Sequence, residues 1–62
     1  MTTPPTHIAE ALKAVEFAME VIRPDTRTQA RRLHAGFLTA RTIDTHTIEA
    51  HWDAIADRWP QD

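Results

Sequence analysis

The segment from Ile8 to Ile22 is apolar on two sides, which constrains the fold more than any other feature of the chain. Its large aliphatic residues recur at steps of four, three, four and three, the spacing of one face of an α-helix. They are Ile8, Leu12, Val15, Met19 and Ile22. Phe17 and Val21 fall on nearly the opposite side, so the apolar arc covers roughly 220°, where about 100° suffices for one core. We expect the aliphatic series to face the core and the opposite side to face a partner.

The outer side of this helix is therefore the predicted partner-binding surface. It consists of Phe17, Val21, Ala14 and Ala18. A second copy of the chain and a larger protein would both bury this side, so a homodimer and a hetero-complex both stay open. Self-association also suits the length, because chains this short usually need oligomerisation, disulfides, a metal or very regular helix packing to be stable.

Composition favours a single helical domain over residues 1–62, with residues 1–5 as a flexible tail. The chain has 62 residues, one glycine, and no cysteine, serine, asparagine or tyrosine. The absence of cysteine excludes disulfides and thiolate metal sites. The scarcity of turn-forming residues suits helices. No apolar run approaches the ~20 residues of a membrane span, so no contact with a membrane is expected.

Three helices are expected, over about 6–23, 26–40 and 45–59. Pro24 and Pro60 end the first and third, because the residue before a proline is pushed away from the α region. The predicted N-terminal caps are Thr6, Asp25 or Thr26, and Asp44 or Thr45. Short connections favour antiparallel neighbours, so the predicted fold is an all-α three-helix bundle that is oligomeric through its first helix.

The second and third helices each have a predicted core stripe. In the third helix it is formed by Ile48, Trp52, Ile55 and Trp59. In the second helix we expect Ala30, Leu33 and Phe37 to face the core. Gly36 lies inside the second helix, where glycine costs about 1 kcal/mol relative to alanine. We expect it to allow the close approach of a neighbouring helix, with a bend in the second helix as the alternative.

Charge is divided by segment. All four charged residues of the segment 26–41 are arginines, whereas the net charges of 8–22 and 44–59 are −2 and −3. The arginines are Arg27, Arg31, Arg32 and Arg41. In one interpretation they pair with acids of the flanking helices and favour the antiparallel arrangement. In the other they contact phosphates or an acidic protein partner. The side of the helix so used would present Arg27, Arg31, Arg41, His34 and Leu38.

DNA binding is the second choice among the functions. The segment 28–36 is faintly similar to the start of a helix-turn-helix, but Leu33 stands three residues before Gly36, where that motif has about five. The segment that follows, 37–43, reads as a continuation of the second helix. A looser version places the turn at Arg41–Asp44 and makes the third helix the reading helix, but its acidic character is a poor match for phosphates.

Catalysis and metal binding are not expected. His46, Glu49, Asp53 and Asp57 share one side of the third helix, but metal sites normally draw ligands from more than one element. We therefore predict no metal and no cofactor. The chain has no serine or cysteine nucleophile and no glycine-rich phosphate loop, and we expect it not to be an enzyme. A partly buried, hydrogen-bonded imidazole is the expected state of His34.

The sequence thus predicts a small, non-enzymatic protein–protein interaction or regulatory module that self-associates or docks on a larger protein. Its composition is typical of small accessory proteins of bacteria and their phages, and a cytoplasmic location is expected. The alternative is a small DNA-binding regulator that uses the basic second helix.

Overall fold

The computed structural model describes residues 5–61, which form three α-helices and a short 3₁₀ helix. Helix α1 spans Pro5–Ile22, α2 spans Arg27–Ala40, α3 spans Thr45–Ile55, and the 3₁₀ helix η1 spans Ala56–Arg58. The predicted all-α three-helix fold is confirmed. Of the predicted N-terminal tail, residues 1–4 lie outside the described residues.

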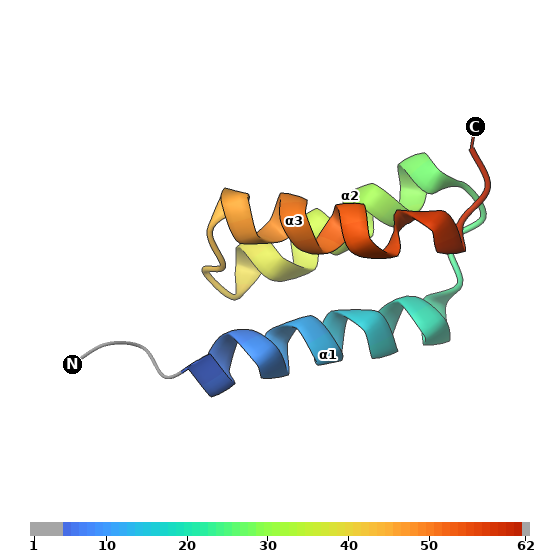
Figure 1. The fold of residues 1–62 in the computed structure, drawn as a ribbon. Coiled ribbons are helices and arrows are strands. Elements are labelled where there is room, and N and C mark those ends of the chain that lie inside the picture. The colour runs from blue at the N-terminus through green and yellow to red at the C-terminus, as the bar shows by residue number, and fades with distance from the viewer. Residues whose placement is uncertain (1–4, 62) are drawn as a thin grey trace.

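Successive helices run in alternating directions (Figure 1). Helices α2 and α3 form an antiparallel pair, and α1 lies along this pair, antiparallel to α2. The turn between α2 and α3 lies at the same end as the beginning of α1, and the C-terminal segment lies at the other end (Figure 1). This arrangement lets the three helices share one core.

The cores of α1 and α3 follow the predicted stripes in part. In α1 the buried residues are Ala11, Val15 and Met19, with Ile8 and Leu12 partly buried against them. In α3 they are Ile48, Trp52 and Ile55. Ile22 is an exception, since it was expected in the core and is 60% exposed. It is the last residue of α1, next to the turn into α2.

The core stripe of α2 differs from the predicted one. Ala30, His34 and Leu38, at steps of four, are all fully buried. Leu33 and Phe37 are only partly buried at its border.

The interpretation of the arginines as a contact surface placed His34 and Leu38 on its side, and their full burial shows that this was wrong. The separate expectation of a buried, hydrogen-bonded His34 agrees with the structure, although the burial is complete and not partial. The predicted core stripe of the second helix was chosen by hydrophobicity alone. This excluded His34, whose ring has a polar partner, His51, inside the bundle.

Side-chain caps begin α2 and α3. Thr26 caps α2, where its Oγ1 accepts a hydrogen bond from the backbone N–H of Gln29 at 3.1 Å. The Gln29 side chain accepts in turn from the backbone N–H of Asp25 at 3.3 Å, one residue before the position that a capping box uses. Asp44 caps α3 and accepts from both the backbone N–H and the hydroxyl of Thr47.

The helix ends differ from the predictions by a few residues. Helix α1 begins at Pro5, so the predicted cap Thr6 lies inside its first turn. Helix α3 stops at Ile55, and the chain continues through η1 to an extended Trp59 before Pro60. On one straight helix Trp52 and Trp59 would be about 10 Å apart along the axis. The extended turn instead brings the two indole rings to 5.5 Å between centroids, with their planes 18° apart.

Helix α2 ends in a Schellman motif with a threonine in the left-handed position. The N–H of Thr42 donates to the carbonyl of Thr39, and the N–H of Ile43 donates to that of Leu38, both at 3.0 Å. Ile43 and Leu38, which this motif brings together, are both buried. Thr42 has φ of 60°, where glycine is preferred and a β-branched side chain is strained.

We predict that Thr42→Gly raises the free energy of unfolding by about 0.5–1 kcal/mol, because glycine removes this strain at a smaller cost in unfolded-state entropy. The matched control is Thr39→Gly inside α2, which is also exposed. It should lower stability by about 0.5 kcal/mol. Urea unfolding followed by circular dichroism measures both, and effects of the same sign would contradict the assignment of the motif.

Gly36 does not mediate the close packing that was expected. It is exposed in the middle of α2, and a Cβ added there would meet no atom within 4 Å. Helix packing inside the chain therefore gives no reason for glycine at this position.

Gly36→Ala should accordingly stabilise the protein by about 1 kcal/mol, since it restores helix propensity without a clash. The midpoint of urea unfolding checks this. A loss of stability would mean that another molecule or a different helix geometry uses this position.

Candidate functional site

The predicted partner surface on α1 faces outward. Phe17 is 68% exposed and Val21 is 66% exposed, whereas Ala14 and Ala18 between them and the core are half-buried. Phe17, Val21 and Ile22 are the exposed large hydrophobic residues of the described chain. All three lie in the last six residues of α1, so the exposed apolar surface is concentrated on one stretch of one helix.

The arginines of α2 do not pair with the neighbouring acids. Arg27 donates from Nε and Nη2 to the backbone carbonyl of Trp59, at 3.3 and 3.1 Å, and so ties the C-terminal segment to the start of α2. The guanidinium of Arg41 lies 4.5 Å from the ring centre of Phe37. Arg31 and Arg32 are exposed. Over residues 5–61 no ion pair joins α2 to an acid of α1 or α3, so the interpretation by mutual pairing was wrong.

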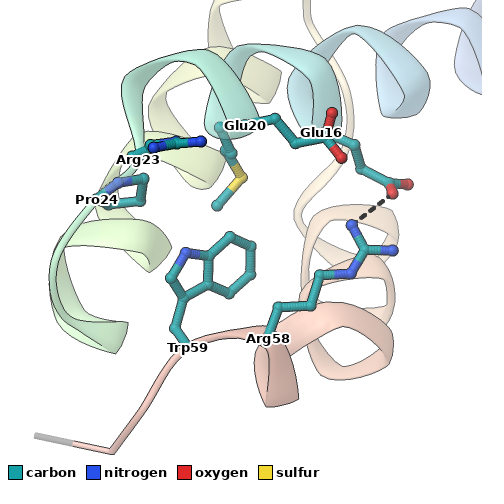
Figure 2. A pocket seen from close by; sticks show the side chains of 7 residues that line it. Glu16, Glu20, Arg23, Pro24, Arg58 and Trp59 are labelled. Atoms are coloured by element: carbon teal, nitrogen blue, oxygen red, sulfur yellow. Dashed lines mark hydrogen bonds and ion pairs between the residues drawn. The ribbon is translucent and has the colours of Figure 1, made fainter.

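A row of polar side chains instead crosses the bundle from α2 to α1. His34 Nε2 lies 2.7 Å from His51 Nδ1 on α3, and the two ring planes are within 13° of each other. His51 Nε2 lies 3.0 Å from Glu16 Oε2 on α1. Arg58 of η1 donates from Nη1 to Glu16 Oε1 at 2.9 Å (Figure 2). One carboxylate therefore connects α1 to the third helix and, through it, to α2.

Hydrogen-bond chemistry sets one end of this row. An ionised carboxylate only accepts, so His51 donates from Nε2. Between the two rings, the tautomers decide which nitrogen donates. The second ring nitrogen of His34 is Nδ1. That atom is buried and has no hydrogen-bond partner within the described chain.

Burial and charge set the protonation of the row. Burial lowers the pKa of His34 from 6.5 to about 4, with the neighbouring His51 as a second cause. The pKa of Glu16 is also lowered, chiefly by the hydrogen bond from His51 and further by that from Arg58. Near neutral pH the row thus contains an ionised Glu16 and a neutral His34.

The depressed pKa of His34 predicts a loss of stability on mild acidification. Between pH 6.5 and about 4 the unfolded chain binds a proton that the folded chain does not. Stability is therefore fully present above pH 6.5 and falls as the pH drops, by at most about 1.4 kcal/mol per pH unit from this group. The free energy of unfolding measured between pH 6.5 and 5 tests this prediction. Most carboxyl groups titrate below this range, so they contribute little to the change.

Two variants test whether His34 causes this dependence of stability on pH. His34→Gln should flatten it, whereas His46→Gln, which removes an exposed imidazole, should leave it unchanged. A titration of the His34 ring by NMR gives a check that does not depend on the variant's fold. An imidazole that titrates near 6.5 would contradict the burial of its ring.

Two cavities adjoin this row. The first, of about 670 Å³, lies between the end of α1 and the segment after α3, where Trp59 faces Arg23 and Pro24 and the Glu16–Arg58 pair forms one edge (Figure 2). The second, of about 330 Å³, lies between α2 and α3. It is lined by His34, Trp52, Arg31, Glu49 and Asp53, and by Ala35, Thr39, Thr45 and Ile48. Helix α1 contributes no residue to the second cavity.

Within residues 5–61 no group of three or more histidines and acids is placed to hold a metal ion. His46, Glu49, Asp53 and Asp57 do not form such a group. The functional feature that sequence reasoning missed is the row from His34 to Glu16. Its three members on the α-helices are His34, His51 and Glu16. Each lies in a core stripe or next to one, and this position could have indicated that polar side chains meet there.

Comparison with models of protein families, with curated protein sequences and with solved structures finds no match to this chain. None of its described helices combines the length and the apolarity that a membrane crossing needs.

Proposed function

We propose that this protein is a small, non-enzymatic interaction module that self-associates through the outer face of α1, defined as Ala14, Phe17, Ala18 and Val21. The observation that carries the proposal is the exposure of about two thirds of Phe17 and Val21, at 68% and 66%. Contiguous exposed apolar surface of this kind typically marks an interaction site. The half-buried alanines beside it would let a second helix approach closely.

Charge favours a second copy in antiparallel orientation. Lys13 and Glu20 are exposed on α1, four residues before and three residues after Phe17. In an antiparallel pair centred on Phe17, Lys13 lies beside Glu20 of the partner subunit, and two-fold symmetry makes this contact twice. A parallel pair aligns residues of the same number, so Lys13 of one subunit and Glu20 of the other stay about 10 Å apart along the axis. Electrostatic matching of this kind selects orientation more than it adds affinity.

The chemistry of the interior supports a non-enzymatic function. The buried Nδ1 of His34 has no hydrogen-bond partner, so no hydroxyl or other nucleophile of the described chain is paired with it. A nucleophile beside its base is the usual signature of covalent catalysis.

DNA binding by α2 is less well supported. Two of the four arginines that it would use have internal contacts, Arg27 with the carbonyl of Trp59 and Arg41 with the ring of Phe37. Arg31 lines a cavity together with Glu49 and Asp53, whose charges repel phosphate.

Self-association predicts a mass that rises with concentration, from 7.1 kDa toward twice that value. One helix face buries less than a standard interface, so we expect a dissociation constant of about 1–100 µM. Phe17→Glu together with Val21→Glu should give a folded monomer at every concentration in sedimentation equilibrium. Ala50→Glu with Ala54→Glu is the matched control, because it adds the same charge at the same spacing on an exposed part of α3.

A charge exchange then tests the orientation. Lys13→Glu alone and Glu20→Lys alone should each weaken the dimer about threefold to tenfold, and the double exchange should restore it. A protein that stays at 7.1 kDa up to millimolar concentration would disprove self-association. Dimerisation without rescue by the double exchange would reject the antiparallel arrangement.

A further inference from the structure

We propose that the cavity between the end of α1 and the segment after α3 binds a free amino acid with an aromatic side chain. In this site the carboxylate of the ligand pairs with Arg23, its ammonium group pairs with Glu20, and its ring lies against Trp59 (Figure 2). None of these residues belongs to the outer face of α1, so the site does not depend on the proposed self-association.

The first argument is the sign of the charges around the cavity. Two acids and two arginines line it, so the lining has no formal net charge; they are Glu16, Glu20, Arg23 and Arg58. Glu16 and Arg58 pair with each other at 2.9 Å. Glu20 and Arg23 are exposed, and within residues 5–61 neither forms an ion pair or a side-chain hydrogen bond. The cavity thus offers one free charge of each sign, which a zwitterion matches better than an anion or a cation does.

The second argument is the separation of these two charges. Glu20 lies on α1, whereas Arg23 follows the end of the helix with φ of 57°, a left-handed backbone that takes its side chain out of the helical row. Arg23 and Pro24 lie on one side of Trp59, and Arg58 lies on the other (Figure 2). An amino acid carries its ammonium and carboxylate groups on one carbon atom, so it can bridge two side chains that do not reach each other.

The third argument is the residue type at position 23. The left-handed position after a helix is usually glycine, because a Cβ is strained there. The other left-handed residue of the described chain besides glycine, Thr42, uses its hydroxyl in a hydrogen bond to the carbonyl of Arg41. The guanidinium of Arg23 has no such use inside residues 5–61. Strained residues of this kind concentrate at functional sites, where the side chain contacts a ligand.

The fourth argument is the apolar wall. Trp59 and Pro24 are half-buried and line the cavity together with the buried Met19. Trp52 stacks on Trp59 at 5.5 Å, and Arg27 donates to the backbone carbonyl of Trp59, so the indole is held in place. Indole and thioether groups pack well against aromatic rings. The cavity volume of about 670 Å³ lies inside the range of about 300–1,000 Å³ for small-molecule sites.

L-Phenylalanine is the probe for this site, because it does not absorb the light that excites tryptophan. Its titration into the full chain should change the tryptophan fluorescence in a saturable way, with a dissociation constant of about 1 mM. Phenethylammonium lacks the carboxylate and 3-phenylpropanoate lacks the ammonium group, so each should bind about threefold to fivefold more weakly. Glycine, a zwitterion without a ring, should cause no change. By NMR, the indole N–H resonance of Trp59 should move with phenylalanine.

Two variants test the charged contacts. Arg23→Gly should raise the midpoint of urea unfolding, because it removes the left-handed strain, and should weaken phenylalanine binding about threefold to fivefold. A residue with only a structural role would not give these two effects together. Glu20→Gln should weaken phenylalanine binding by a similar factor.

Glu20 also belongs to the charge pair proposed for the dimer, so the titrations use protein concentrations at which the mass is 7.1 kDa. Lys13→Gln is the control, since it removes the other member of that pair and lies outside the cavity. It should change the mass at high protein concentration and leave phenylalanine binding unchanged, which separates the two proposals.

Three results would each overturn the amino-acid site. The first is the absence of a saturable change with phenylalanine. The second is equally tight binding of phenethylammonium or of 3-phenylpropanoate. The third is an unchanged affinity for phenylalanine in Arg23→Gly or in Glu20→Gln.

Discussion

The arrangement of this small bundle depends on the contact between Glu16 and His51. Helix α1 packs mainly against α2, and the two described ion pairs that join it to the third helical segment both end on the Glu16 carboxylate. The same carboxylate accepts from Nε2 of His51, whose Nδ1 lies beside the buried His34 in the centre of the bundle. One acidic side chain thus supplies the described ion pairs of α1, beside the apolar core that packs it against α2.

The protein separates two kinds of surface. The outer face of α1 is apolar and projecting, whereas the cavity between α2 and α3 is polar, concave and built over a buried imidazole. The polar row reaches the cavity at His34, one of its lining residues, and contributes no residue to the outer face of α1. Side-chain exposure rises along the row, from the fully buried His34 to 12% at His51, 31% at Glu16 and 52% at Arg58.

Periodicity predicted the three helices and the stripe of Ile48, Trp52 and Ile55 on α3, and capping preferences gave Thr26 and Asp44 as one of two candidates each, because these are local features of the chain. The exposed position of Phe17 and Val21 also followed from the angular distribution of apolar residues in one helix. The row from His34 to Glu16 could not be predicted in this way. His34 and His51 are 17 residues apart in the sequence, and His51 and Glu16 are 35 residues apart, so they meet only through tertiary packing. The exposure of Ile22 was missed as well, because the apolar repeat of α1 continues to its last residue, beyond the residues that the core buries. The left-handed Thr42 was missed because threonine is rare in that conformation.

The stacked indole pair has a spectroscopic consequence. The chain has two tryptophans and no tyrosine, so its absorption and emission near 280–350 nm arise almost wholly from Trp52 and Trp59. Their rings lie 5.5 Å apart, close enough for their electronic transitions to couple. Trp52 belongs to the core of α3 and Trp59 to the extended segment after η1, which Arg27 holds in place. The intrinsic fluorescence of this protein is thus a local signal for the docking of its C-terminal segment, separate from the amide signal of its helices.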